Sequence, residues 1–241
     1  MLGVEVYRTM TPEVAIPALA APGSALPRHG RAPVRTAAPQ PALKRAMDIL
    51  GAALLLLVTA PLFALLALLI RADGGPVLYA HERVGRGGRR FGCLKFRSMV
   101  VDSQARLAAL LAADPEARAE WEATRKLKDD PRVTRIGRFL RATSLDELPQ
   151  VLNVLRGEMS LVGPRPVVAA ELEEHYGKAA EHYLSVRPGI TGLWQISGRS
   201  DTTYATRVAL DIDYASNPSL LADLRILLRT PLAVLSRRGA Y

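Results

Sequence analysis

Two neighbouring acids, Asp146 and Glu147, are the residues whose type and spacing most directly suggest chemistry in this sequence. Together with Ser144 they fit the S-x-x-E pattern of a capping box, which would place both carboxylates at or just before a helix N-terminus. The helix dipole favours ionised carboxylates there. Such a pair can hold Mg²⁺ or attack phosphorus. The pattern alone also fits an ordinary helix cap, which is the more common reason for it.

Arginines lie on both sides of the acid pair in the sequence. Arg165 follows it between two prolines, in a loop with little conformational freedom. Four others recur every three residues ahead of it: Arg132, Arg135, Arg138 and Arg141. Arginines held near carboxylates suit a substrate that carries several phosphate oxygens together with a divalent ion. A helix with this many arginines is also typical of a solvated or lipid-facing surface.

Other kinds of site find little support in the sequence. The glycine loop at Gly85–Gly88 lacks the Lys-Ser/Thr ending of a Walker loop and the βαβ setting of a dinucleotide fingerprint. The four histidines have no metal-ligand spacing. The single cysteine, Cys93, excludes a disulfide scaffold and has no evident partner base.

The chain has 241 residues and a formal net charge of +9, and the position of that charge is informative. About +4 lies in residues 1–45 and about +5 in residues 71–100, whereas residues 101–241 carry only about +1. The excess therefore flanks Ile49–Ile70, an apolar stretch of 22 residues without a charge. An uncharged apolar run of this length predicts a membrane helix. A basic nucleic-acid-binding domain would carry its charge on the folded domain instead, so we expect no nucleic-acid partner.

Both ends of the apolar stretch are basic, and basic residues mark the cytoplasmic side of a membrane. Pro61 lies just past the middle, where it removes a helix hydrogen bond and bends the chain. Thr59 is placed to bond a carbonyl freed there. We therefore expect a re-entrant helical hairpin that enters and leaves by the cytoplasmic face, with Lys44 and Arg45 at the entry, near anionic head groups.

The remaining elements predict an α+β chain that is mainly helical. Residues 1–40, basic and rich in Ala and Pro, read as a disordered tail; residues 41–72 form the re-entrant membrane helix; residues 73–241 form a cytoplasmic catalytic domain. The last begins with a small β-hairpin, Val77–Ala80 and Phe91–Phe96. Helices are expected over 102–128, with a break at Asp114-Pro115, over 133–141, after the acid pair through about Leu155, and over 171–185 and 220–235. The last of these either lies at the membrane interface or packs on the core.

Several motifs then resemble one known family. They are Lys44-Arg45 with the proline-containing apolar segment, Glu82-Arg83-Val84-Gly85, Lys95-Phe96-Arg97-Ser98-Met99, the stretch 134–141, the stretch 144–150, Gly157 to Pro166 and Arg187 to Arg199. In this order they resemble the bacterial sugar transferases, the monotopic polyprenyl-phosphate phosphoglycosyl transferases, in their minimal exopolysaccharide-initiating form. The resemblance covers about residues 42–235.

This resemblance implies transfer of a sugar 1-phosphate from a UDP-sugar to undecaprenyl phosphate, with release of UMP, at the cytoplasmic face of the inner membrane. Asp146 would be the nucleophile that forms a covalent phosphosugar, and Glu147 would hold Mg²⁺. Arg141 and Arg165 would contact phosphate or nucleotide, with Lys95 and Arg97 as further contributors. UDP-glucose or UDP-galactose is the expected donor, for an exopolysaccharide, capsule or O-antigen repeat unit.

The alternative is a non-catalytic membrane scaffold that holds other enzymes of polysaccharide assembly. The joint presence of the two acids with Arg141 and Arg165 argues against it. The expected partners are therefore the UDP-sugar, undecaprenyl phosphate and membrane lipids. The oligomeric state is left open, with a homodimer as one candidate.

Overall fold

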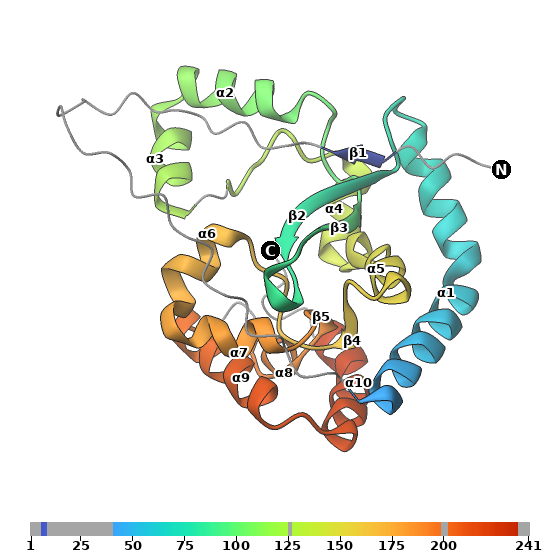
Figure 1. Ribbon diagram of the computed structural model, residues 1–241. Helices are drawn as coiled ribbons and strands as arrows, with labels where there is room; N and C mark the ends of the chain where they lie inside the picture. The colour runs from blue at the N-terminus through green and yellow to red at the C-terminus, as the bar shows by residue number, and fades with distance from the viewer. Residues whose placement is uncertain (1–5, 9–40, 125–126, 199–201, 236–241) are drawn as a thin grey trace.

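The structure, a computed structural model, describes residues 6–8, 41–124, 127–198 and 202–235. It is mainly helical, with two small sheets near its centre (Figure 1). The strands are β1 Val6–Arg8, β2 Leu78–Val84, β3 Arg90–Phe96, β4 Ser160–Val162 and β5 Gly189–Thr191. The main helices are α1 Ala42–Arg71, α2 Ser103–Ala113, α3 Pro115–Thr124, α4 Arg135–Ala142, α5 Gln150–Arg156, α9 Tyr204–Ser216 and α10 Leu220–Leu235. Shorter helical turns are η1 Arg86–Gly88, η2 Leu145–Glu147, α6 Ala169–Glu171, η3 Leu172–Tyr176, η4 Gly177–Ala179, α7 Ala180–Ser185 and α8 Leu193–Ile196.

The predicted β-hairpin is confirmed, because β2 and β3 pair antiparallel from Leu78 opposite Phe96 to Val84 opposite Arg90. The outer edge of β2 pairs with β1 in parallel, so three residues of the expected disordered tail form a strand. Val and Tyr favour strands, and a free sheet edge offers unpaired backbone groups to such a segment. The rest of the tail, residues 1–5 and 9–40, lies outside the described residues.

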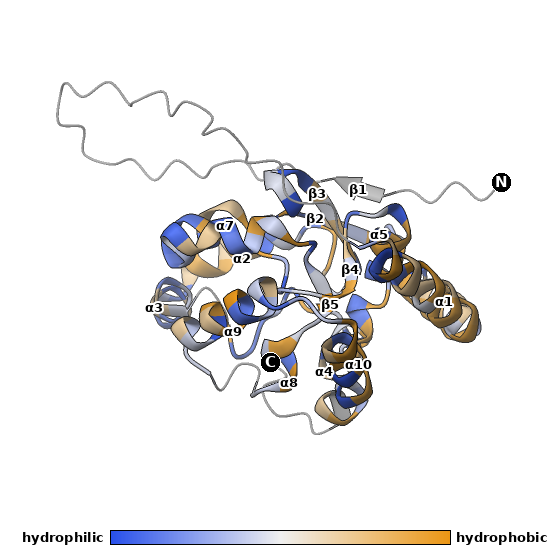
Figure 2. Ribbon diagram, turned by 60° about the horizontal axis from the view of Figure 1, so that its bottom comes forward, coloured by the Kyte–Doolittle hydropathy of each residue, from blue (hydrophilic) through white to orange (hydrophobic). Residues whose placement is uncertain are grey.

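Helix α1 continues through Pro61 as one element of 30 residues, about 45 Å long at 1.5 Å per residue. Figure 1 shows it curving along one side of the molecule, and Figure 2 shows that it is hydrophobic over most of its length. Thr59 does bond a backbone carbonyl, but it is that of Leu55 at 2.7 Å, one turn before it. Length and composition would allow this helix to cross a membrane. A chain reversal at Pro61 is not part of the described helix.

Both ends of α1 are buried in the same globular body. Near its start, Ala52 joins an apolar cluster with residues of β3, α5, β4, α9 and α10. At its end, Leu66 and Ile70 pack with Leu78, Phe96 and Leu140 in a second cluster. Between these ends its leucines are exposed, among them Leu57 at 73% and Leu68 at 70% of the residue surface. The helix is therefore held at both ends and presents an apolar face between them.

A second sheet, formed by β4 and β5 in parallel, is not predicted by the sequence. Its strands have three residues each and lie among prolines and glycines, so they carry no periodic signal. The predicted break between α2 and α3 is confirmed at Asp114, as are α4, α5 and α10 within two residues of their expected bounds. The expected helix over 171–185 is present but irregular, because Gly177 adopts a positive φ of 48° and divides it.

Candidate functional site

The acid pair lies in the short turn η2, between α4 and α5. Ser144, directly before it, has a φ of 57°, and among the described residues no other non-glycine residue has a positive φ. Such a backbone is strained, and strain of this kind is commonly retained at functional sites. Pro149 then precedes α5, where its fixed φ suits the start of a helix. The turn leaves Asp146 only 9% exposed.

The capping box expected from Ser144 and Glu147 does not form. The Ser144 side chain makes no cap hydrogen bond, because its left-handed backbone differs from the extended conformation of a capping residue. The carbonyl of Ser144 instead accepts the backbone N–H of Glu147 at 3.2 Å. The carboxylate of Glu147 points to a lysine from another element, so the pair serves the site rather than a helix cap.

That lysine is Lys95 on β3, which brings a cation to both acids. Its Nζ lies 2.9 Å from Oε1 of Glu147 and 3.5 Å from Oδ2 of Asp146. Burial pulls the pKa of Lys95 down, but the charges of Glu147 and Asp146 outweigh it, so the pKa of Lys95 is raised. Lys95 therefore stays protonated between the two carboxylates.

The pKa of Asp146 is raised, although two cations lie near its carboxylate. Burial raises the pKa of Asp146; the cations Lys95 and Arg141 oppose this rise, while the neighbouring Glu147 adds to it. A buried carboxylate that is ionised near neutral pH has lost part of its hydration, which makes it a better nucleophile.

The two arginines expected at the acid pair do lie beside it. Nη1 of Arg165 is 3.7 Å from Oε1 of Glu147, and its guanidinium carbon lies 5.8 Å from the centre of the Trp194 ring. Arg141 is held by Ser98, which lies just after β3: Nε of Arg141 donates to Oγ of Ser98 at 2.9 Å. Helix α4 comes this close because Gly137 has no side chain: a Cβ there would overlap the carbonyl of Ser98.

Arg97 does not join the site, contrary to the expectation from sequence. It is 8% exposed and its guanidinium bonds the carbonyls of Pro76, Ile70 and Met99 and the carboxylate of Asp73. Along β3 successive side chains alternate between faces, but Arg97 lies just past the strand, where the chain turns towards the end of α1. Its role is to fasten that end of α1. Arg132 is likewise internal, paired with Asp130 at 2.7 Å.

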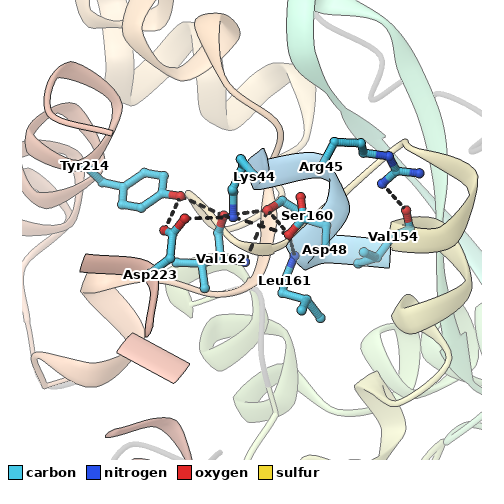
Figure 3. A network of polar contacts seen from close by, with 9 residues as sticks. All are labelled: Lys44, Arg45, Asp48, Val154, Ser160, Leu161, Val162, Tyr214 and Asp223. Carbon is cyan, nitrogen blue, oxygen red and sulfur yellow. Dashed lines mark hydrogen bonds and ion pairs between the residues drawn. The ribbon is translucent and has the colours of Figure 1, made fainter. Parts of the chain in front are cut away.

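Lys44 and Arg45 also differ from expectation, because both bind protein groups rather than facing lipid head groups. Lys44 is 6% exposed and its Nζ lies 3.1 Å from Asp223 on α10 and 3.3 Å from Asp48 (Figure 3). Arg45 donates to the carbonyls of Val154 and Leu155 at 2.7 and 2.9 Å. These carbonyls end α5 and have no partner within the helix, so a cation there is favourable. A basic pair beside an apolar run looks the same in the sequence whether it contacts lipid head groups or groups of the protein.

A small pocket opens beside the acid pair. Its polar lining includes Lys95, Glu147 and Arg165, together with three residues that sequence reasoning did not select: Arg83, Gln150 and Gln195. Cys93 also lines it, and burial raises the pKa of this thiol to about 11, so it is unreactive near neutral pH. A larger hollow lies between α2 and α3, but it contains none of the expected site residues. Arg83 and Gln195 do fall within the motifs that carry the family resemblance, which was the one signal for them.

The donor set next to the acid pair suits magnesium better than a transition metal. Within the described ranges there is no cluster of three or more His, Cys, Asp or Glu side chains that would enclose a metal ion. Mg²⁺ does not need such a cluster, because it is usually held by one or two carboxylates and completes its shell with water and substrate phosphates. Glu147, which lines the pocket, and its neighbour Asp146 supply such carboxylates.

Comparisons with known proteins agree with this arrangement. The family model described as "Bacterial sugar transferase" matches residues 39–237. A relative from Erwinia amylovora named "UDP-galactose-lipid carrier transferase" is 55% identical over 199 residues, covering 83% of this chain and 42% of the relative. "Exopolysaccharide production protein ExoY" of Rhizobium meliloti is also 55% identical, over 82% of this chain and 88% of its own length. "UDP-glucose:undecaprenyl-phosphate glucose-1-phosphate transferase" of Caulobacter vibrioides is 42% identical, over 82% and 72%.

The chain spans less than half the length of the Erwinia relative and most of the length of the Rhizobium and Caulobacter relatives. In each case the shared part contains the hairpin of β2 and β3, the acid turn η2 and the Arg165 loop. On the extent of the match and the identity, this chain belongs to the bacterial sugar transferase family.

Proposed function

We propose that this protein transfers a hexose 1-phosphate from a UDP-sugar to undecaprenyl phosphate, releasing UMP, as the first membrane step of exopolysaccharide, capsule or O-antigen synthesis. The observation that carries the proposal is that Glu147, Lys95 and Arg165 line one pocket, while Asp146 lies beside them, 3.5 Å from Nζ of Lys95. Two acids with two cations match a donor whose diphosphate must be neutralised before an anion can approach it.

Asp146 acts as the nucleophile in this proposal. One oxygen of its carboxylate bonds to the phosphorus that carries the sugar, and the bond from that phosphorus to the UMP oxygen breaks. UMP leaves with the electron pair of that bond. An oxygen of undecaprenyl phosphate then attacks the same phosphorus, and the Asp146 carboxylate is regenerated as the lipid diphosphate sugar forms. Lys95 and Arg165 stay close to the phosphate oxygens throughout.

Magnesium is the proposed cofactor. Glu147 would hold it, together with phosphate oxygens of the donor; it would supply charge neutralisation at the diphosphate. Lys95 then has a second task, since its contact with Glu147 at 2.9 Å orients that carboxylate.

We further propose that the protein is monotopic and lies on the cytoplasmic face of the inner membrane. Both ends of α1 are anchored in one globular body, so a membrane that takes up its exposed middle leaves both ends on the same side. Helix α10 adds a second lipid-facing stripe of exposed leucines, Leu221, Leu224, Leu228 and Leu232, next to the exposed Arg225 and Arg229.

The sugar proposed is galactose or glucose. The relatives named for galactose in Erwinia and Salmonella are 55% identical, and those named for glucose in Caulobacter and Komagataeibacter are 42% identical. We therefore expect faster turnover with UDP-galactose than with UDP-glucose.

The test is a UMP-release assay with detergent-solubilised protein, undecaprenyl phosphate and each UDP-sugar in turn. The wild-type protein should release UMP, and Asp146→Asn should lower the rate at least about a thousandfold. Asp129→Asn, at an exposed acid outside the site, is the matched control and should be unaffected. Absence of UMP release from the wild-type protein with every sugar tested would favour the scaffold hypothesis instead.

A further inference from the structure

Arg207 on α9 is a buried cation. The two hydrogen-bond donors on one edge of its guanidinium, Nε and Nη2, have no acceptor among the described residues. The residue is 9% exposed. Its Nε and Nη2 are both buried, and neither finds an acceptor in the part of the chain that the structure describes. Leaving one buried charged donor unsatisfied is costly, and two on one edge are unusual.

Aromatic rings contact the guanidinium of Arg207, but no acceptor among the described residues bonds its Nε and Nη2 edge. Its guanidinium carbon lies 4.8 Å from the centre of the Trp194 ring and 4.8 Å from that of Tyr204. Such cation–π contacts act through the flat face of the guanidinium. Nε and Nη2 lie in its plane, and this pair matches two oxygens of one phosphate or carboxylate.

The nearest acid on the same helix is already engaged elsewhere. Asp211 is one turn further along α9, and its Oδ2 accepts the hydroxyl of Tyr176 at 2.6 Å. Burial raises the pKa of Asp211 to about 6, while the Tyr176 hydrogen bond and the charges of Arg207 and Arg165 lower it. Asp211 therefore balances charge near Arg207 without occupying the free edge.

Trp194 connects this arginine to the pocket beside the acid pair. The same indole ring that contacts Arg207 also contacts Arg165, which lies 3.7 Å from Glu147. The next residue, Gln195, lines the pocket and has a buried Oε1 without a hydrogen-bond partner. An unused donor edge and an unused acceptor thus flank one tryptophan, whose ring contacts Arg165 of the pocket lining. A ligand that carries both oxyanion acceptors and hydroxyl donors would satisfy both.

We propose that Arg207 is a further anion-binding residue beside this pocket, in addition to Lys95 and Arg165, and that its Nε and Nη2 take two oxygens of a substrate phosphate. This inference rests on the proposed function. The phosphate chemistry is shared by the nucleotide donor and the lipid acceptor, and the experiment separates the two.

The experiment compares Arg207→Lys with the wild-type full-length protein in detergent. Lysine keeps the positive charge but loses the two-donor edge, so binding of the phosphate that Arg207 serves should weaken about tenfold or more. KM is measured separately for the UDP-sugar and for undecaprenyl phosphate, and UMP binding is measured by calorimetry. Arg106→Lys, at an exposed arginine on α2, is the matched control. Should Arg207→Lys not fold, Arg207→Gln carries the same measurements.

A higher KM for the UDP-sugar with weaker UMP binding assigns the nucleotide phosphate to Arg207. A higher KM for undecaprenyl phosphate alone, with UMP binding unchanged, assigns the lipid phosphate. If the wild-type protein turns over and the variant keeps both KM values and its UMP affinity, Arg207 is only a packing residue and the inference is overturned. A wild-type protein that neither binds UMP nor turns over would contradict the proposed function itself.

Discussion

At the residue scale, Lys95 determines how the two acids can coexist. Two carboxylates side by side in a buried turn repel each other, and a single ammonium within 3.5 Å of both relieves this. The balance is incomplete for Asp146, because burial still raises its pKa. The site therefore holds one carboxylate, Asp146, in a less stable ionised state.

This balance predicts how the pH dependence should move in Lys95→Gln. Asp146 attacks only when ionised, so the rate falls as the pH drops through its pKa in the folded protein. Lys95 lowers that pKa, and its removal should raise the pKa further. The acid limb of the pH–rate profile for UMP release should therefore shift to higher pH, measured at saturating UDP-sugar. Lys128→Gln, at an exposed lysine, should leave the limb in place; an unshifted or lowered limb in Lys95→Gln would contradict the assignment.

The same pKa predicts that Asp146→Asn is inactive yet not less stable. A carboxyl whose pKa is raised by folding favours the protonated form in the folded state. Above that folded pKa its ionisation therefore costs stability, and the neutral amide avoids this cost. At pH 7 the thermal unfolding temperature of Asp146→Asn should equal or exceed that of the wild-type protein. A decrease larger than that of the Asp129→Asn control would show that Asp146 has a structural role instead.

The residue-scale predictions from sequence succeeded where type and neighbours agreed. Asp146, Glu147 and Arg165 were placed together because acids and arginines near one another suggest phosphate chemistry. Arg97 was misassigned because it is the first residue after β3, which ends at Phe96. Its side chain turns to the end of α1, where it bonds the carbonyl of Ile70. Arg207 had no signal, since a single arginine in an amphipathic helix reads as an exposed residue until its burial is known.

At the element scale, the polar contacts drawn in Figure 3 join residues of α1, α5, β4, α9 and α10. Lys44 on α1 lies between Asp48 and Asp223 of α10, and its Nζ also bonds the carbonyl of Val162 on β4 at 3.3 Å. Asp48 is fully buried and its Oδ1 accepts the backbone N–H of Leu161 at 3.0 Å. Because β4 leads into the Arg165 loop, this cluster links the start of α1 to the pocket.

We expect Lys44→Met to destabilise the protein by about 3 kcal/mol or more, because it leaves two buried carboxylates without their cation. Asp223→Asn should be milder, since Lys44 keeps Asp48 and the amide can still accept from Tyr214. Thermal or denaturant unfolding in detergent gives both values. Arg71→Met, at an exposed cation at the other end of α1, should stay within about 0.5 kcal/mol of the wild-type protein. Equal effects of Lys44→Met and Arg71→Met would show that the buried cluster is not an anchor.

The sequence predicts elements where their pattern is periodic, and length alone does not decide this, because the 13-residue helix α9 is not among the expected helices. The hairpin and the helices α4 and α10 show clear period-2 or period-3.6 patterns, and each was found. The strands β4 and β5 were missed because three residues cannot show a period. The capping box at Ser144 was predicted wrongly, because the sequence pattern does not reveal the positive φ imposed by the close passage of α4 into η2.

At the scale of the whole molecule, the charge distribution has a different meaning from the one first suggested. The sequence predicts Lys44 and Arg45 near lipid head groups and Arg97 near phosphate, yet these three residues tie the two ends of α1 to the globular body. Their positive charges are thus largely used inside the protein. What remains for lipid is the exposed apolar middle of α1 and the leucine stripe of α10.

This arrangement predicts that both ends of α1 are on the cytoplasmic side. Single cysteines at Ala42 and Ala72, exposed residues at its two ends, should resist a membrane-impermeant maleimide in intact bacteria and react once the cells are permeabilised. Leu57→Cys, in the exposed apolar middle, should stay unlabelled in both conditions because lipid shields it. The native Cys93 gives little background, since it is 2% exposed and burial raises its pKa to about 11. Labelling of either end in intact cells would show that α1 crosses the membrane, and the anchoring at both ends would then have to open on insertion.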